Sequence, residues 1–190
     1  METPEAPFEA IRETLKKAAA ALRKAEIPFA LGGGLASWAR GGPESGHDLD
    51  LLVKPADADR ALEALADSGM RPERPPEDWL YKVWDGDVMV DLIFQPEGGA
   101  VTEELIQRSE EREVEAVRMR VISANDLLTT KLLALKEHEV DYDSVLEVAR
   151  SLREQIDWKA LKKSTGHSPY ARAFFTLVAG LGIEDSLCES

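Results

Sequence analysis

Three aspartates stand where a buried strand would normally carry apolar side chains. Asp48 and Asp50 bracket one leucine in HDLDLLV, and Asp91 interrupts the apolar run VMVDLIF. Residues two apart in a strand project to the same face, so the first two carboxylates lie side by side. Neighbouring carboxylates repel each other, and one takes up a proton unless a cation lies between them. Mg²⁺ prefers oxygen ligands of this kind, so the pattern predicts a magnesium site.

Asp91 extends this prediction to a second strand. A bare carboxylate among apolar residues is costly unless a partner compensates it. If the two strands are neighbours, three carboxylates converge, which suits one or two metal ions that bridge the phosphates of a nucleotide. Two structural alternatives remain open. The pair Asp48–Asp50 could face water at a strand edge, and Asp91 could form a salt bridge with a buried arginine.

A run of glycines precedes these aspartates in LGGGLASWA. A glycine turn that opens a helix presents free backbone N–H groups, which suits a phosphate. Gly33 and Gly34 also allow a ligand to approach the backbone closely, because no side chain intervenes. The alternative is an ordinary tight turn. The order of glycines, Asp-x-Asp and a later single Asp is more specific than any one of these parts.

The elements that must position these residues follow from periodicity and from breaker residues. Helices are expected at 8–25, 35–40, 56–66, 126–138, 143–152 and 170–181, and strands at 29–31, 49–53, 79–84, 88–94 and 118–122. The pair Asp85-Gly86 marks a hairpin between two of these strands. This order predicts an α/β (α+β) fold, a mixed sheet flanked by helices and followed by a helical C-terminal domain. The predicted domains are residues 1–99 and 100–190.

Composition excludes several classes of protein. With 44% apolar residues the chain of 190 residues is globular, and its single cysteine, Cys188, excludes an internal disulfide. No apolar run is long enough for a membrane helix, and the charged N-terminal stretch is not a signal peptide, so a cytoplasmic protein is expected. The formal charge of −13 disfavours a protein that mainly grips nucleic acid, and it suits a cationic small molecule or a basic partner.

Histidines and acidic runs add little to the predicted site. His47 precedes Asp48 and should point away from both aspartates, while His138 and His167 lack the spacing of a zinc site. The charged run SEEREVEAVRMR is expected to be a solvated surface.

The segments GGGLASWARGG, HDLDLLV and VMVDLIF together resemble the minimal nucleotidyltransferases of the DNA polymerase β superfamily. The resemblance covers residues 27–94 and is nearest to the bacterial branch of antibiotic nucleotidyltransferases and abortive-infection-type toxins. It implies transfer of a nucleoside monophosphate from an NTP to an acceptor hydroxyl, with release of pyrophosphate and with Mg²⁺ as cofactor. It also implies that Asp48 and Asp50 hold the metals, and that Asp91 binds the catalytic metal and helps deprotonate the acceptor.

A weaker similarity in DLLTTKLLALKEHEVDYDSV draws attention to Lys131. This lysine occupies the centre of the apolar face of its predicted helix, where it could extend its stem along apolar surface to water. Similar toxins imply instead a lysine that reaches the triphosphate. Asp141 or Asp143 is expected nearby, and the helix register does not decide between them.

Two departures from the family pattern support an alternative function. Many relatives have a serine after the second glycine, where this chain has Gly34 or Leu35, and Glu44 and Gly46 replace an arginine and a threonine before the aspartates. The alternative is a catalytically silent binding or regulatory module of the same fold. For the enzyme, the acceptor could be a cationic small molecule, a tRNA end or a protein hydroxyl, and no membrane partner is expected.

Overall fold

The computed structural model describes residues 8–43 and 48–184. One sheet of seven strands, in the order β3-β4-β5-β2-β1-β7-β6, organises the chain. Neighbouring strands are antiparallel except for β1 beside β7 and β2 beside β5, so the sheet is mixed as predicted. The strands are β1 (Phe29–Leu31), β2 (Asp48–Val53), β3 (Arg71–Glu73), β4 (Leu80–Asp85), β5 (Val88–Ile93), β6 (Glu110–Val114) and β7 (Val117–Val121).

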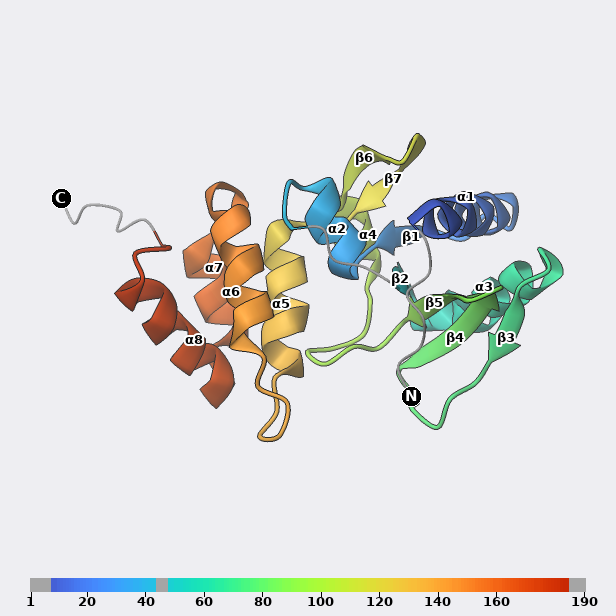
Figure 1. Ribbon diagram of the computed structural model, residues 1–190. Coiled ribbons are helices and arrows are strands. Elements are labelled where there is room, and N and C mark those ends of the chain that lie inside the picture. Colours follow the sequence, from blue (N-terminus) through green and yellow to red (C-terminus); the bar gives the residue numbers. More distant parts are fainter. Residues whose placement is uncertain (1–7, 44–47, 185–190) are drawn as a thin grey trace.

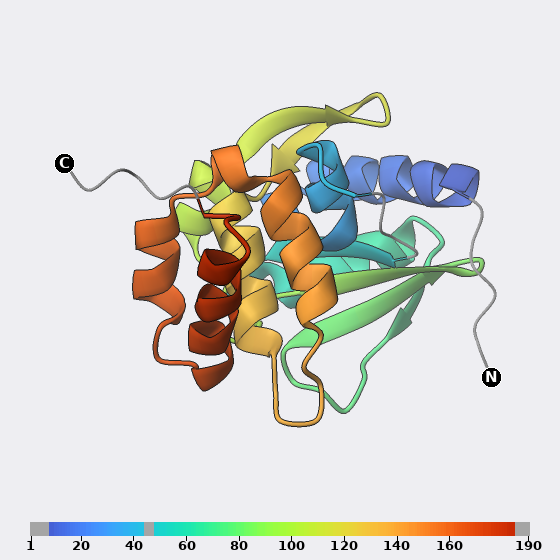
Figure 2. The same cartoon turned by 60° about the vertical axis from the view of Figure 1, so that its left-hand side comes forward.

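Eight α-helices and two short 3-10 turns complete the described residues. Figure 1 shows the last four helices packed together beside the sheet, with α2 between this bundle and the strands. Figure 2 shows the same bundle from a second side. The helices are α1 (Phe8–Lys24), α2 (Gly33–Ala39), α3 (Ala58–Asp67), α4 (Glu103–Arg108), α5 (Ala124–Ala134), α6 (Tyr142–Ser151), α7 (Trp158–Thr165) and α8 (Pro169–Gly180); the 3-10 turns are η1 (Pro55–Asp57) and η2 (Arg153–Gln155).

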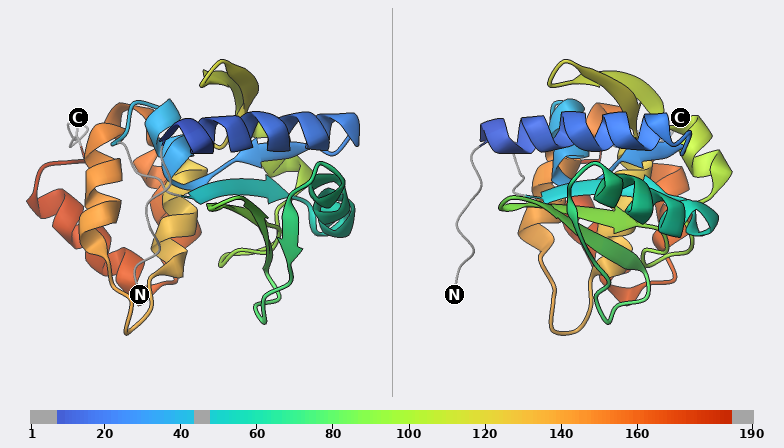
Figure 3. Two further views of the ribbon diagram at one scale, coloured as in Figure 1. Left: turned by 45° about the vertical axis from the view of Figure 1, so that its right-hand side comes forward. Right: turned by 90° about the vertical axis from the view of Figure 1, so that its right-hand side faces the viewer.

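The two faces of the central strands differ in what covers them. Helices α1 and α3 contact the strands β2, β4 and β5 from one face, where the alternate residues of β2 and β5 are fully buried apolar side chains. Figure 3 shows α1 lying lengthwise along the sheet. The opposite face carries the aspartates. Burial of one apolar row therefore fixes which face the carboxylates present, because a slip by one residue would exchange the two faces.

The sheet extends beyond the predicted boundary at residues 99 and 100. Strands β6 and β7 lie C-terminal to it, and β7 pairs in parallel with β1 through Leu31 and Val121. The bundle begins only with α5. The division into domains 1–99 and 100–190 stays a prediction.

Several local predictions need correction. Helix α2 begins at Gly33 rather than Leu35, so the glycines belong to its first turn, with Gly32 as the N-cap. Helix α5 ends at Ala134, short of His138, because Leu135 turns to an extended conformation and Lys136 pairs with Glu139 in a bridge. The charged run around residue 110 forms the hairpin β6–β7, although most of its charged side chains are exposed.

Candidate active site

The parallel pairing of β2 with β5 brings two of the predicted carboxylates together. Asp50 lies opposite Asp91 in this register, and Asp48 lies opposite Met89. Directly paired residues point to the same face of a sheet, so Asp50 and Asp91 are neighbours on the face that α1 and α3 leave free. Strand β2 is the fourth of the seven strands, so the pair does not lie on a strand edge. Asp48 begins β2 and is exposed.

The carboxylate of Asp50 is in an electrostatically unfavourable place. Burial raises its pKa from 3.8 to about 7, and the charges of Asp91 and Asp48 add to this effect. The ammonium groups of Lys131 and Lys82 oppose it. A carboxyl with a raised pKa is partly protonated at neutral pH, and a cation bound beside it would favour the ionised form.

Gly33 makes this position of Asp50 possible. A Cβ atom at residue 33 would lie 1.6 Å from Oδ2 of Asp50, and the backbone there has a φ of +57°, which favours glycine. The neighbouring Gly32 donates its N–H to the Asp50 carbonyl at 2.8 Å. The first turn of α2 therefore rests directly on the carboxylate. Gly34 lies in the same turn and is partly buried.

Asp91 has a cationic neighbour that the sequence prediction missed. Lys82 of β4 is its cross-strand partner, and the Lys82 Nζ atom lies 3.4 Å from Oδ1 of Asp91. The partner is thus a lysine and not the buried arginine considered above. Burial raises the pKa of Asp91, while Lys82 lowers it and Asp48 raises it. Oδ1 of Asp91 is buried and accepts no hydrogen bond from any described residue.

The sequence did contain a signal for Lys82. Asp85 pairs with Val88 across the two-residue turn that the Asp-Gly dipeptide predicts. Counting back along both strands from this pair places residue 82 opposite residue 91.

Lys131 reaches the site from the helical half of the chain. It lies in the last turn of α5 and is partly buried, and its Nζ lies 3.5 Å from Oγ of Ser144 in α6. Its charge lowers the pKa of Asp50. Of the two acidic residues expected nearby, Asp141 caps α6 by accepting the N–H of Ser144, and Asp143 lies exposed in the first turn of that helix.

Arg40 fixes the far end of α2. Its side chain is almost fully buried, and its Nε donates to the Ile122 carbonyl at 2.5 Å while Nη2 donates to the Val121 carbonyl at 3.2 Å. Gln155 in turn donates to the Arg40 carbonyl at 2.8 Å. The helix that rests on Asp50 is thereby tied to β7 and to the helical bundle.

The donor set fits a divalent cation, although the described residues contain no ready cluster of three or more His, Cys, Asp or Glu side chains that could hold one. Two observations support the fit. Oδ1 of Asp91 is buried and has no hydrogen-bond partner among the described residues. The charge of Asp48 raises the pKa of both Asp50 and Asp91, and the charge of Asp91 raises the pKa of Asp50. His47, Glu44 and Gly46 lie outside the described residues.

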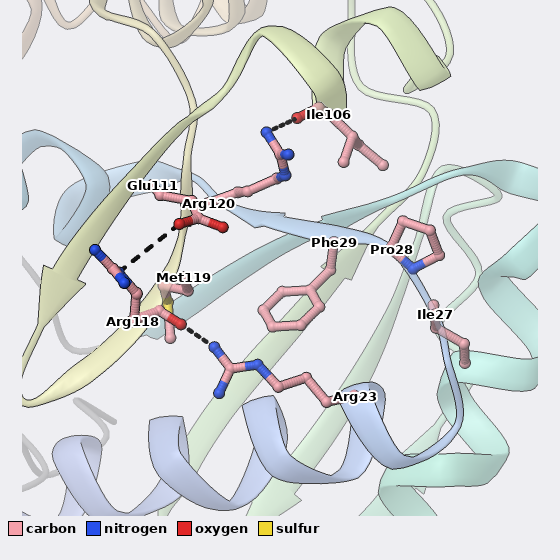
Figure 4. Close-up of a pocket in the computed structure, with 9 residues that line it drawn as sticks. All are labelled: Arg23, Ile27, Pro28, Phe29, Ile106, Glu111, Arg118, Met119 and Arg120. Carbon is pink, nitrogen blue, oxygen red and sulfur yellow. Dashed lines mark hydrogen bonds and ion pairs between the residues drawn. The ribbon is translucent and has the colours of Figure 1, made fainter.

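A hollow at the opposite end of β1 contains none of these carboxylates. Figure 4 shows Arg23, Arg118 and Arg120 around Phe29 and Pro28. The guanidinium group of Arg23 donates to the backbone carbonyl of Arg118. The guanidinium group of Arg120 donates to the backbone carbonyls of Ile106, Gln107 and Ser109. These arginines therefore join α1, α4 and β7 structurally.

The chain matches, over residues 9–188, the profile of a family described as "Uncharacterised nucleotidyltransferase". It belongs to this nucleotidyltransferase family. The nucleotidyltransferase resemblance seen in the glycines and aspartates is confirmed, and the protein is an enzyme of this class. A comparison with curated proteins finds no significant match.

Solved structures show the same fold at low sequence identity. The structure of ANT(2″)-Ia with adenylyl-2″-tobramycin has a TM-score of 0.62 and 15% identity, and the match covers 87% of this nucleotidyltransferase and 97% of that chain. The lincomycin-bound lincosamide adenylyltransferase LnuA has a TM-score of 0.53 and 14% identity, with 76% and 97% covered. The structure of a nucleotidyltransferase-like protein from Paracoccidioides brasiliensis has a TM-score of 0.50 and 13% identity, and the match covers 88% of this chain and 87% of that chain.

No helix among the described residues of the nucleotidyltransferase is both long and apolar enough to cross a bilayer.

Proposed function

We propose that this nucleotidyltransferase transfers a nucleoside monophosphate from an NTP to a hydroxyl group of a small molecule, in a reaction that depends on Mg²⁺. The observation that carries the proposal is the Asp50–Asp91 pair on adjacent parallel strands, with Gly33 pressed against Asp50. The raised pKa of buried Asp50 and the unsatisfied Oδ1 of Asp91 suit a cation, and Mg²⁺ bound with nucleotide phosphates would supply one.

In this proposal Asp48 and Asp50 would hold Mg²⁺, and Asp91 would bind the catalytic ion. Bound Mg²⁺ would neutralise the phosphate charge and make the α-phosphorus more electrophilic. Asp91 accepts the proton of the acceptor hydroxyl. The acceptor oxygen forms a bond to the α-phosphorus, the bond to the bridging oxygen breaks, and pyrophosphate leaves.

The triphosphate lies, in this proposal, between α2 and α5. Gly33 and Gly34 bring backbone N–H groups to one side, and Lys131 brings an ammonium group from the other. Lys131 is only loosely held by Ser144, at 3.5 Å, so it can turn towards a phosphate.

The register of the sheet suggests where the acceptor binds. Leu52, Ile93 and Leu80 form the row on one side of the Asp50–Asp91–Lys82 row, and the two leucines in it are covered. The row on the other side contains Met89 and Trp84, both only partly buried. An acceptor whose hydroxyl reaches Asp91 would therefore lie over Trp84 and Met89.

A small cationic acceptor is the class that we favour. The whole chain has a formal charge of −13, and a hollow over α6 is lined by the carboxylates Asp141, Asp143 and Glu147 with one opposing guanidinium, Arg150. The structures of ANT(2″)-Ia and LnuA were solved with adenylyl-2″-tobramycin and with lincomycin, which are small molecules. A tRNA end and a protein hydroxyl are the alternatives, and the cytoplasm, where NTPs are abundant, is the expected compartment.

The experiment incubates the full chain with each labelled NTP, Mg²⁺ and a panel of acceptors that includes aminoglycosides, lincosamides, tRNA and the protein itself. We expect pyrophosphate release and a labelled small-molecule product in one combination. Asp50→Asn should abolish the product, whereas Asp87→Asn, an exposed carboxylate in the β4–β5 turn, should not. Label on tRNA or on protein would contradict the small-molecule class. Tight Mg²⁺–NTP binding without any product would favour a silent binding module.

A further inference from the structure

The ammonium group of Lys82 lies beside Asp91, where a bound metal ion would otherwise neutralise the charge of this carboxylate. Its Nζ atom lies 3.4 Å from Oδ1 of Asp91 and donates a hydrogen bond to Sδ of Met89 at 3.2 Å. Both contacts are with β5, on the strand face that carries the carboxylates. The ammonium group is therefore directed at the site by two neighbouring residues of one strand.

The contact with Asp91 is not that of a closed structural ion pair. Oδ1 of Asp91 is buried, and the Lys82 ammonium at 3.4 Å lowers the pKa of Asp91 but lies outside the geometry of a good hydrogen bond to this oxygen. The Lys82 side chain is 26% exposed and that of Asp91 is 16% exposed. The lysine can therefore leave towards water, while the carboxylate stays.

The charges around Asp91 determine how Lys82 affects the binding of a metal ion. The carboxylates of Asp50 and Asp91 lie side by side, and the charge of Asp48 and two ammonium groups act on them. That of Lys131 lies next to Ser144, whereas that of Lys82 touches Asp91. A magnesium ion needs to come within about 2.1 Å of a carboxylate oxygen, where a nearby ammonium group repels it.

We propose that Lys82 is a tethered cation that competes with a divalent ion for Asp91. It neutralises Asp91 in the metal-free protein, and it weakens the binding of the divalent ion there until nucleotide phosphates add their own negative charge. The inference rests on the proposed function, because it requires a divalent ion at Asp91. Lys82 is thus a positioning residue that acts through Asp91.

The test measures binding of Mg²⁺ alone, without nucleotide, by isothermal titration calorimetry. A pH of 8.5 is chosen because it lies above the pKa of about 7 for Asp50, so that protons compete little with the metal. We expect Lys82→Met to bind Mg²⁺ about tenfold more tightly than the parent, which corresponds to about 1.4 kcal/mol. Lys82→Arg keeps the charge and should bind Mg²⁺ no more tightly than the parent.

Lys17→Met is the matched control. Lys17 pairs with Asp85 at 2.6 Å, at the end of the same hairpin but from helix α1, which covers the opposite face. Its loss removes one positive charge from the chain without touching the site, so Mg²⁺ affinity should stay at the parent value. An equal gain in both lysine variants would show only a general charge effect and would overturn the proposal.

Two further outcomes separate the inference from the proposed function. If Asp50→Asn loses Mg²⁺ binding while Lys82→Met binds Mg²⁺ as the parent does, the role of Lys82 is wrong and the metal site stands. If Asp50→Asn and Asp91→Asn both bind Mg²⁺ as the parent does, the metal site is wrong, and the inference falls with it. Should Lys82→Met fail to fold by circular dichroism, Lys82→Gln replaces it with the same expectation.

Discussion

The carboxylate of Asp50 lies where a side chain of residue 33 would begin. A Cβ atom built on Gly33 would be 1.6 Å from Oδ2 of Asp50 and 2.5 Å from its Cγ. Helix α2 and strand β2 can approach this closely only because residue 33 is glycine. The glycine motif and the Asp-x-Asp motif are therefore parts of one contact, which any nucleotide bound at the carboxylates would share.

Gly33→Ala should displace Asp50 and remove the stabilisation by Mg²⁺–NTP in a thermal shift assay. Gly86→Ala is the control, because Gly86 also has a positive φ, +62° against +57°, but a Cβ atom there meets nothing. Both variants bear the backbone strain of about 1–2 kcal/mol. Gly33→Ala should lose about 1–3 kcal/mol more through overpacking. If the two variants were equally stable and were stabilised equally by Mg²⁺–NTP, the close contact between Gly33 and Asp50 would be contradicted.

Asp50 should make the protein less stable as the pH rises from about 4 to about 7. Its pKa is about 7 in the folded chain against an ordinary value of 3.8, so the folded state holds a proton that the unfolded chain releases in this range. The free energy of unfolding then falls by up to about 1.4 kcal/mol per pH unit. Urea unfolding at pH 5 and pH 8 without metal should show a smaller fall for Asp50→Asn than for the parent. Asp87→Asn, the exposed control, should behave as the parent does.

Asp91→Asn should change the free energy of unfolding by less than about 1 kcal/mol in EDTA. The variant relieves the repulsion from Asp50 and Asp48, and the Lys82 ammonium that loses its partner is partly exposed to water. A buried structural salt bridge would instead lose about 3–5 kcal/mol. The stabilisation by Mg²⁺ with NTP should disappear in the same variant. A large loss of unfolding free energy in EDTA, with the stabilisation by Mg²⁺ and NTP preserved, would show that Asp91 has a structural role.

Lys131→Met keeps the apolar stem and removes the ammonium group. Stability should hold, because the one hydrogen bond of this ammonium group to the described residues is the 3.5 Å contact with Ser144. Affinity for Mg²⁺–NTP should fall by about 1.5–3 kcal/mol, the range for hydrogen bonds to charged groups. Lys136→Met, an exposed lysine paired with Glu97 just beyond α5, is the control and should bind as the parent does. Equal affinity of both variants for Mg²⁺–NTP would show that the Lys131 ammonium group lies in water and does not contact the triphosphate.

The sequence was sufficient to predict the core strands of the sheet and the common face of Asp48 and Asp50. Alternation in β2 places Asp48 and Asp50 on one face, and apolar periodicity gives α1, α3 and most of the bundle. These elements carry strong local signals because one side of each is buried.

The missed elements lack such a signal. Strand β3 is three residues long and fully exposed, and β6 is rich in glutamate, so neither shows apolar alternation. The short helices α4 and α7 begin at the caps Thr102 and Asp157, which are recognisable only once the neighbouring elements are placed. The pairing of Asp50 with Asp91 required the β2–β5 register, which no local pattern specifies.

The most direct test of the central claim is equilibrium binding of a non-hydrolysable NTP analogue to the parent, Asp48→Asn and Asp50→Asn, with Mg²⁺ and with EDTA, at pH 8.5. Fluorescence anisotropy of a labelled analogue does not depend on knowing the acceptor. The account predicts binding to the parent that requires Mg²⁺ and is lost in both folded variants, while Asp87→Asn binds normally. Equal affinity of the parent and both variants for the Mg²⁺ complex would contradict a metal–nucleotide site at these aspartates.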